Sequence, residues 1–260
     1  MNPQHPFDEP SHLDEAHGQA AQDSPLEEFH RQRQLLTPED LQGQDVDIVG
    51  AGALGGAIAI CLCKMGFGIT SRITVTDFDV CKSHNLATQW FRPSDVLVER
   101  SKVEALSEMV GWVCDRDLST VNGRFSGNED RRLGPIVILA VDSLAERRRI
   151  WSRLKKRREV AFLVDARMGA EVLEVYVAGS NQDERTAYED SLDDRGESFD
   201  EPCTRQGILY TVMGAAAVVG SLLRAHARSE PYPRHIAMDF RNFFIKVSPV
   251  AVSSPGVRPR

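Results

Sequence analysis

The chain has 260 residues with a hydrophobic content of 42%, which suffices for one α/β domain with a sizeable core. Its formal net charge of −7 at pH 7 argues against nucleic acid as a partner bound through a broadly basic surface. No apolar stretch reaches the ~20 residues of a membrane span and no signal segment is visible, so we expect a cytoplasmic protein that needs no membrane.

The first part of the chain is polar. Residues 1–26 are acidic, contain proline and have almost no apolar periodicity, which predicts a disordered arm. The folded domain is then expected over residues 27–260. Its first element is a short helix within residues 27–42, broken at Pro38.

A glycine turn follows a short apolar strand in DVDIVGAGALGG, residues 45–56. Gly50 allows a tight turn, Gly52 lets the backbone approach a phosphate, and Gly55 lets the following helix pack on the strand. The positive end of that helix points at the anion. By itself the spacing also fits an ordinary Gly-rich turn, but the strand before it and the helical segment after it favour a nucleotide site.

A second strand, SRITVTDFD, ends in two carboxylates, Asp77 and Asp79. They lie two residues apart and therefore share one face of the strand. An acid at the end of this strand is the residue that binds ribose in a nucleotide-binding βαβ unit, and the register favours Asp77. The alternative to ribose binding is that these carboxylates simply end the strand in solvent.

Strands and helices continue to alternate, which predicts a Rossmann-like, doubly wound, mainly parallel α/β sheet with a C-terminal helix and strand extension. The expected elements are a helix capped by Ser101, a strand within 121–125, a buried strand in 135–142 that ends at Asp142, a basic helix over 143–159, strands in 160–166 and 171–179, an acidic surface loop over 181–202, a long helix within 205–227 and a strand in 239–248.

Taken together, the glycine turn, the TDFD strand end, the NL that follows, a later lysine and the strand ending in Asp resemble the ThiF/MoeB/HesA superfamily, which includes the ubiquitin-activating enzymes. The resemblance covers about residues 30–228. It implies a homodimer that uses ATP and Mg²⁺ to adenylate the C-terminal carboxylate of a ubiquitin-like or sulfur-carrier protein. In several members a cysteine then takes the product as a thioester, and a downstream conjugating enzyme is a further partner.

The resemblance assigns roles to residues by motif. Asp77 matches the ribose acid, Asn85 the asparagine of the S-N-L-x-R-Q stretch, and Lys102 the lysine after the next loop. Asp142 matches the acid that meets magnesium and the adenylate, and Ser143 stands where asparagine is common. The backbone around Gly52 and Ala53 would donate hydrogen bonds to the phosphates.

Two arginine positions bear on the phosphates. Thr88 stands where the family has arginine, so a charge is missing there, and Arg92 is a candidate substitute. Arg33 matches the arginine that reaches into the neighbouring subunit's site, which implies a dimer. A solvated helix face is the alternative interpretation of Arg33.

Cys203 in EPCT resembles the thioester cysteine of the ubiquitin-activating enzymes and the corresponding cysteine of ThiF and MoeB. Its place at a loop-to-helix junction would lower the thiol pKa, although a structural thiol also fits. The paired CxxC motifs common in ThiF and MoeB are absent, so zinc is not implied. The remaining cysteines are expected to be small buried hydrophobic residues: Cys61, Cys63, Cys81 and Cys114.

Three other candidate site residues could instead have purely structural or solvent-exposed roles. Asp142 could cap the next helix, Lys102 could be solvated, and Asn85 could form an Asx turn. Three other functions stay open: an NAD(P)-dependent oxidoreductase, a non-catalytic partner subunit of an activating enzyme, and a tRNA-modifying dehydratase of the same superfamily. The oxidoreductase would leave EPCT unexplained.

Overall fold

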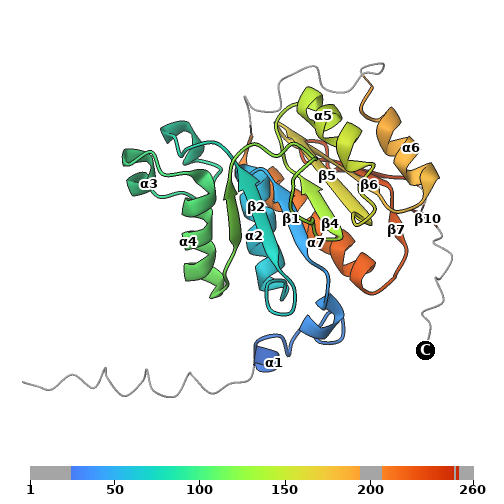
Figure 1. Cartoon of the computed structure of the whole chain (residues 1–260), viewed down its shortest axis with the longest axis horizontal. Helices are drawn as coiled ribbons and strands as arrows, with labels where there is room; N and C mark the ends of the chain where they lie inside the picture. Colours follow the sequence, from blue (N-terminus) through green and yellow to red (C-terminus); the bar gives the residue numbers. More distant parts are fainter. Residues whose placement is uncertain (1–24, 194–206, 249, 252–260) are drawn as a thin grey trace, which may run out of the picture.

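The fold is taken from a computed structural model that describes residues 25–193, 207–248 and 250–251 (Figure 1). Nearly all of the arm expected over residues 1–26 lies outside the described residues, as does Cys203. The described chain contains an eight-stranded sheet in the order β3-β2-β1-β4-β5-β6-β8-β9. This order confirms the predicted Rossmann-like fold class.

The first five strands in that order are parallel: β3 Ser119–Asn122, β2 Ile73–Asp77, β1 Val46–Val49, β4 Ile136–Leu139 and β5 Phe162–Gly169. β1 and β4 are buried at every position, as a strand covered on both faces requires. Because parallel strands all end at the same edge, their C-terminal loops gather at one edge of the sheet.

The rest of the sheet is antiparallel: β6 Val172–Ala178, β8 His235–Asp239 and β9 Phe244–Val247. A separate pair joins β7 Tyr232–Pro233 to β10 Val250–Ala251. The prediction of a single strand over residues 239–248 is therefore wrong. Its first part is a turn in which Asp239 accepts hydrogen bonds from the backbone of Arg241 and Asn242, and the strand before this turn was missed.

Helices cover both faces of the sheet (Figure 1). One core packs α2 Ala53–Lys64, α4 Lys102–Cys114 and α7 Leu209–Ala227 on the sheet, and a second packs α5 Leu144–Leu154 and α6 Gln182–Asp190 on the other face. Short elements complete the described chain: α1 Pro25–Glu28, α3 Pro93–Leu97 and the 3₁₀ helices η1 Pro38–Leu41 and η2 Ser83–Asn85.

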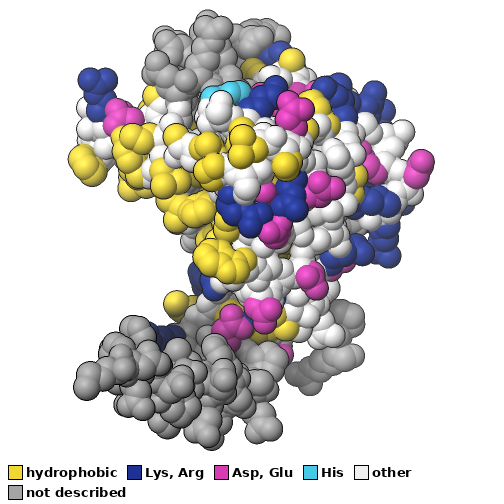
Figure 2. Space-filling model, turned by 90° about the vertical axis from the view of Figure 1, so that its left-hand side faces the viewer, with side chains coloured by type: hydrophobic (Ala, Val, Ile, Leu, Met, Phe, Trp, Pro, Cys, Tyr) yellow, Lys and Arg dark blue, Asp and Glu magenta, His cyan; other side chains and the backbone are white. Residues whose placement is uncertain are grey.

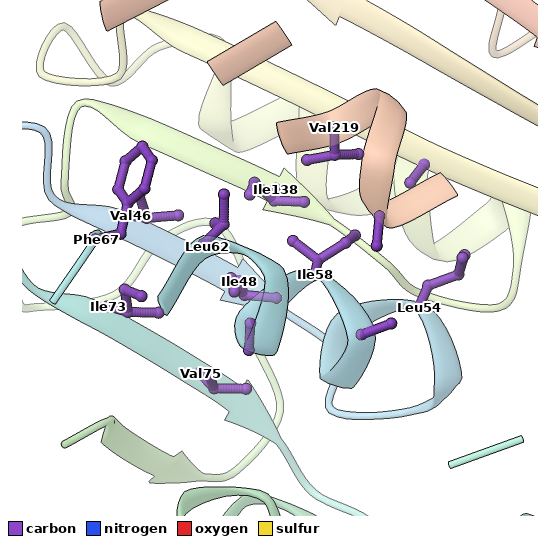
Figure 3. Close-up of a cluster of buried hydrophobic side chains, with 14 of the residues drawn as sticks. Val46, Ile48, Leu54, Ile58, Leu62, Phe67, Ile73, Val75, Ile138 and Val219 are labelled. Carbon is purple, nitrogen blue, oxygen red and sulfur yellow. The ribbon is translucent and has the colours of Figure 1, made fainter. Parts of the chain in front are cut away.

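The larger core is centred on α2. In Figure 3, Ile58 and Leu62 of this helix point toward Ile48 and Ile138 of the sheet, and Val219 of α7 closes the cluster from above. All of these side chains are buried. The packing fixes the start of α2, and with it the glycine turn, against the ends of β1 and β4.

The acidic segment contains a helix where a surface loop was expected. Asn181 caps α6 by accepting a hydrogen bond from the Glu184 amide at 2.8 Å, and Tyr188 is buried against the sheet. The capping residue and the buried side chains outweigh the high charge. Residues 194–202 of the expected loop lie outside the described residues.

Helix α7 is long and apolar enough to cross a membrane by length and composition alone. Half of that apolar window is nevertheless buried inside the protein, chiefly against α2 and the sheet. A core helix passes the same test, so this feature does not indicate a membrane protein.

Candidate functional site

Two glycines of the predicted turn are required by geometry. Gly50 has φ +104°, and a Cβ there would lie 2.6 Å from the carbonyl oxygen of Ala140. A Cβ on Gly55 would lie 1.8 Å from the carbonyl oxygen of Gly50. These glycines let the start of α2 approach β1 and β4, as the sequence predicts.

Gly52 is the N-cap of α2. Apart from its chain neighbours, the Gln89 side chain is the only part of the described chain within 4.0 Å of the place a Cβ would take. The space beside this backbone belongs to a cavity of about 410 Å³ at the carboxyl edge of the parallel strands. Most of the predicted site residues line it: Gly50, Gly52, Ala53, Asp77, Asn85, Lys102, Asp142 and Ser143. Helix α2 therefore directs its positive N-terminal end into this cavity.

Asp77 links the glycine turn to the end of β2. One carboxylate oxygen accepts a hydrogen bond from the Ala51 amide at 2.6 Å and the other from the Asp79 amide at 2.8 Å. A carboxylate oxygen can accept more than one hydrogen bond, so a ribose hydroxyl can still bind here. The side chain is only partly buried at the cavity wall.

The two neighbours Asp142 and Ser143 have separate positions. Ser143 is the N-cap of α5, and its Oγ accepts a hydrogen bond from the Glu146 amide at 3.1 Å. The capping role considered for Asp142 therefore belongs to Ser143. Asp142 is exposed at the cavity wall, where its carboxylate can meet a ligand.

The described residues contain no group of three or more His, Cys, Asp or Glu side chains placed to hold a metal ion together. Magnesium in nucleotide sites is commonly held by one or two carboxylates together with substrate phosphates. The exposed carboxylate of Asp142 at the cavity wall fits that arrangement.

Lys102 is not a solvated helix lysine. Its side chain is 11% exposed, and its Nζ donates to Asp79 at 2.8 Å. The Lys102 backbone amide also donates to the Asp79 carbonyl, at 2.9 Å. This double attachment holds a cation at the cavity wall next to the end of β2.

Asn85 is buried, and its side-chain oxygen accepts a hydrogen bond from the amide of Lys82, three residues before it, at 3.0 Å. This contact caps η2 and is not the Asx turn considered as the alternative, in which the side chain would bond to backbone two residues further on. Thr88 lines the same cavity. Arg92 does not, because its guanidinium pairs with Asp95 at 3.2 Å and Glu108 at 2.7 Å. The structure therefore gives no support to Arg92 as the substitute for the arginine missing at Thr88.

Sequence reasoning missed a buried ionic network behind the cavity. Asp165, fully buried in β5, accepts hydrogen bonds from Arg147, from Arg167 at 2.9 Å and from Tyr188 at 3.0 Å. Arg147 also donates to the carbonyl oxygen of Val141 and so ties down the residue before Asp142. The sequence feature that could have revealed this network is Asp165, an aspartate inside the apolar strand VAFLVDA.

Arg33 does not line the cavity of its own chain. It is exposed in the turns after α1. The adjacent Gln32 donates to the carbonyl oxygen of Met65 at 2.8 Å, which places this segment at the C-terminal end of α2, away from the glycine turn. A role for Arg33 in a neighbouring subunit's site stays a prediction.

The four cysteines within the described residues are free. Burial raises the pKa of the Cys63 thiol to about 12 and of the Cys81 thiol to about 11. Burial also raises the pKa of Cys61 and of Cys114. Thiols with raised pKa values are poor nucleophiles at neutral pH, which agrees with a structural role for these four.

Residues 28–247 match the ThiF family, and the chain belongs to this family. Similar solved structures include E. coli MccB with ATP (15% identity, TM-score 0.61, 81% of this chain and 65% of that chain), E. coli MccB with AMPCPP and MccA (16%, 0.60, 84% and 66%) and PaaA (17%, 0.59, 81% and 74%). The chain thus spans just under two thirds of the length of these MccB chains. No curated protein matches.

At such low identity these structures show the shared fold.

Proposed function

We propose that this protein uses ATP and Mg²⁺ to adenylate the C-terminal carboxylate of a ubiquitin-like or sulfur-carrier protein. The observation that carries the proposal is the cavity at the end of β1, β2 and β4, which combines a helix N-terminus, the cation Lys102 and the exposed carboxylate of Asp142. These are the groups needed to hold a triphosphate and a magnesium ion. The solved structures of E. coli MccB with ATP and with AMPCPP and MccA are consistent with it.

In this mechanism the backbone at Gly52 and Ala53 binds the phosphates, and Asp77 binds the ribose. Asp142 would hold Mg²⁺, which supplies positive charge to the phosphates when it is bound. A carboxylate oxygen of the carrier attacks the α-phosphorus, and pyrophosphate leaves with the electron pair of the broken bond. Lys102 and the N-terminus of α2 stabilise the charge on the phosphates during this step.

The second half of the proposal is thioester transfer to Cys203. The Cys203 thiolate attacks the acyl carbon and AMP leaves. Gly207, the described residue closest after it in sequence, lines the cavity.

We further propose that the active form is a homodimer in which Arg33 serves the partner's site. Large exposed hydrophobic side chains, which commonly mark interaction surfaces, support association. They lie on α3 and α4, where Leu97 and Trp112 are each 84% exposed, and on the hairpin before β9, where Phe243 is 90% exposed. Figure 2 shows hydrophobic side chains across much of the face that carries α3 and α4.

One observation favours a second candidate, a non-catalytic partner subunit. Thr88 lines the cavity without a charge, and Arg92 is held elsewhere by Asp95 and Glu108. Such a subunit would bind a protein partner but would not catalyse ATP–pyrophosphate exchange.

ATP–pyrophosphate exchange, measured with a candidate ubiquitin-like or sulfur-carrier protein, tests the first half of the proposal. Exchange that depends on the carrier would support adenylation, while its absence from correctly folded protein would favour the partner subunit. Cys203→Ala tests the second half. It should leave exchange nearly unchanged and remove any thiol-sensitive adduct with the carrier, since adenylation precedes thiolate attack. Cys63→Ala, at a buried thiol, is the matched control.

A further inference from the structure

Asp165 is a fully buried carboxylate of strand β5. It lies level with the end of β4, because the backbone register pairs it with Leu139, the last residue of that strand. Replacing buried ionic groups by apolar side chains is often neutral or stabilising, so a buried carboxylate is weak evidence for stability. The other role open to such a group is to fix the positions of its neighbours.

Both oxygens of the Asp165 carboxylate are held. One accepts a hydrogen bond from Arg147, and the other accepts from Arg167 at 2.9 Å and from the Tyr188 hydroxyl at 3.0 Å. Arg167 also donates to the carbonyl oxygen and to the hydroxyl of Ser191, each at 3.1 Å. Tyr188 lies in α6 and Ser191 is the C-cap of that helix. The orientation of the carboxylate is therefore fixed from β5 and from α6.

Arg147 carries this constraint to the cavity. Its side chain is buried, and besides Asp165 it donates to the carbonyl oxygen of Val141. A third hydrogen bond, to the carbonyl oxygen of Ala166 at 3.1 Å, joins it to β5. The Val141 carbonyl and the Asp142 amide belong to one planar peptide unit. Arg147 therefore fixes the plane to which the Cα atom of Asp142 is attached.

We propose that Asp165 is a positioning residue for the Mg²⁺ ion that Asp142 would hold. Asp142 lies in the loop between β4 and α5 with its side chain exposed. Mg²⁺ demands near-octahedral geometry with ligand distances of about 2.0–2.1 Å, so an exposed carboxylate binds it well only when the backbone beneath it is held in place. The contacts from Asp165 through Arg147 to Val141 hold that backbone. This inference rests on the metal role of Asp142 in the proposed function.

The alternative is that Asp165 serves stability alone, by neutralising buried arginines. Asp47 offers a comparison, because it is also buried and accepts hydrogen bonds from the Gly134 amide at 2.6 Å and from Arg131 at 2.5 Å. It lies in the first half of β1 and does not line the cavity. Replacing either aspartate by asparagine removes a buried charge from the sheet, but only Asp165 is connected to the peptide of Asp142.

Isothermal titration of the full chain with the ATP analogue AMPCPP, with and without Mg²⁺, gives the factor by which the metal raises nucleotide affinity. Asp165→Asn should reduce this factor about tenfold or more, as the loss of a group that orients a metal ligand commonly does. Asp47→Asn should leave the factor unchanged, although it weakens buried hydrogen bonds and lowers the Tm. Tyr188→Phe keeps the ring and removes one hydrogen bond to Asp165, so it should cause a smaller loss of the same kind and serves if Asp165→Asn does not fold.

A second measurement needs no metal. The NMR order parameter of the Asp142 amide reports directly on the anchored peptide, with about 0.85 for a rigid backbone and below about 0.6 for a flexible one. In metal-free protein it should be high in the wild type and in Asp47→Asn, and it should fall in Asp165→Asn. An unchanged metal factor or an unchanged order parameter in folded Asp165→Asn would overturn the inference, and so would equal losses in Asp47→Asn.

Failure of this inference is distinct from failure of the proposed function. Wild-type protein that gains no nucleotide affinity from Mg²⁺ would refute the metal role of Asp142, while a lower order parameter in Asp165→Asn would still show that Asp165 fixes this peptide. A gain from Mg²⁺ that is as large in Asp165→Asn as in the wild type would retain the metal role and refute the inference.

Discussion

Asp142 and Ser143 are adjacent in sequence, but Ser143 caps a helix and Asp142 faces the cavity. Substituting each in turn therefore separates an effect on stability from an effect on the reaction. Ser143 accepts the hydrogen bond that caps α5, while Asp142 is exposed at the cavity. Replacing a capping serine by alanine costs about 1 kcal/mol. In a domain of this size that lowers the Tm by about 2–4 °C. Asp142→Ala removes no cap and should leave the Tm unchanged.

The effects on the reaction should be reversed. If Asp142 holds the magnesium ion at the phosphates, its loss removes stabilisation on the order of 3 kcal/mol from the transition state, which corresponds to at least about a hundredfold lower rate of ATP–pyrophosphate exchange. Ser143→Ala should slow exchange by less than about tenfold, because its oxygen already serves the helix.

Exchange rates and thermal unfolding by circular dichroism, measured on the same preparations, check both effects. Asp130→Ala is the control, since Asp130 is an exposed aspartate outside the cavity. Exchange by Asp142→Ala within twofold of wild type would refute the metal role. A lower Tm in Asp142→Ala, with none in Ser143→Ala, would refute the division between cap and ligand.

Three further predictions concern the dimer, the buried network and pH. Mixing Arg33→Ala with Asp142→Ala protein should restore about a quarter of wild-type exchange, because half of randomly paired dimers hold one complete site; no recovery despite subunit exchange would place Arg33 outside the partner's site. Asp165→Ala should lower the free energy of unfolding in urea by about 3–5 kcal/mol, since it leaves buried arginines uncompensated, whereas Tyr188→Phe should cost only about 1 kcal/mol. Burial lowers the pKa of His226 to about 4, so below pH 6.5 the unfolded chain takes up the proton first and stability falls toward pH 4, by at most about 1.4 kcal/mol per pH unit. His226→Gln should flatten that slope, and an unchanged slope would exclude His226 as its source.

The sequence predicted the features that depend on local pattern. The glycine spacing, the apolar strands and the helix capped by Ser101 are recognisable because neighbouring residues determine them. The same holds for the carboxylates at strand ends, because every parallel strand ends at one edge of the sheet.

Features that depend on distant pairs were not predictable in this way. Arg124 meets Phe78 only because β3 pairs with β2, although 46 positions separate the two residues. Asp165 meets Arg147 through the packing of α5 on β5. The helix α6 was missed for a different reason. Its cap at Asn181 is visible in the sequence, but the acidic composition concealed it.

The tight connection between β5 and β6 has a consequence for how the chain folds. Seven residue pairs join these strands across a turn in which Ala170 has φ +50°, so their contacts are short in sequence. A hairpin forms in about 1–10 μs, whereas parallel neighbours such as β1 and β4 must first close a long loop. We expect this hairpin to assemble early and to give the parallel strands an edge on which to pair. Folding φ-values near one in the hairpin and near zero in β2 would show this order, and the opposite pattern would exclude it.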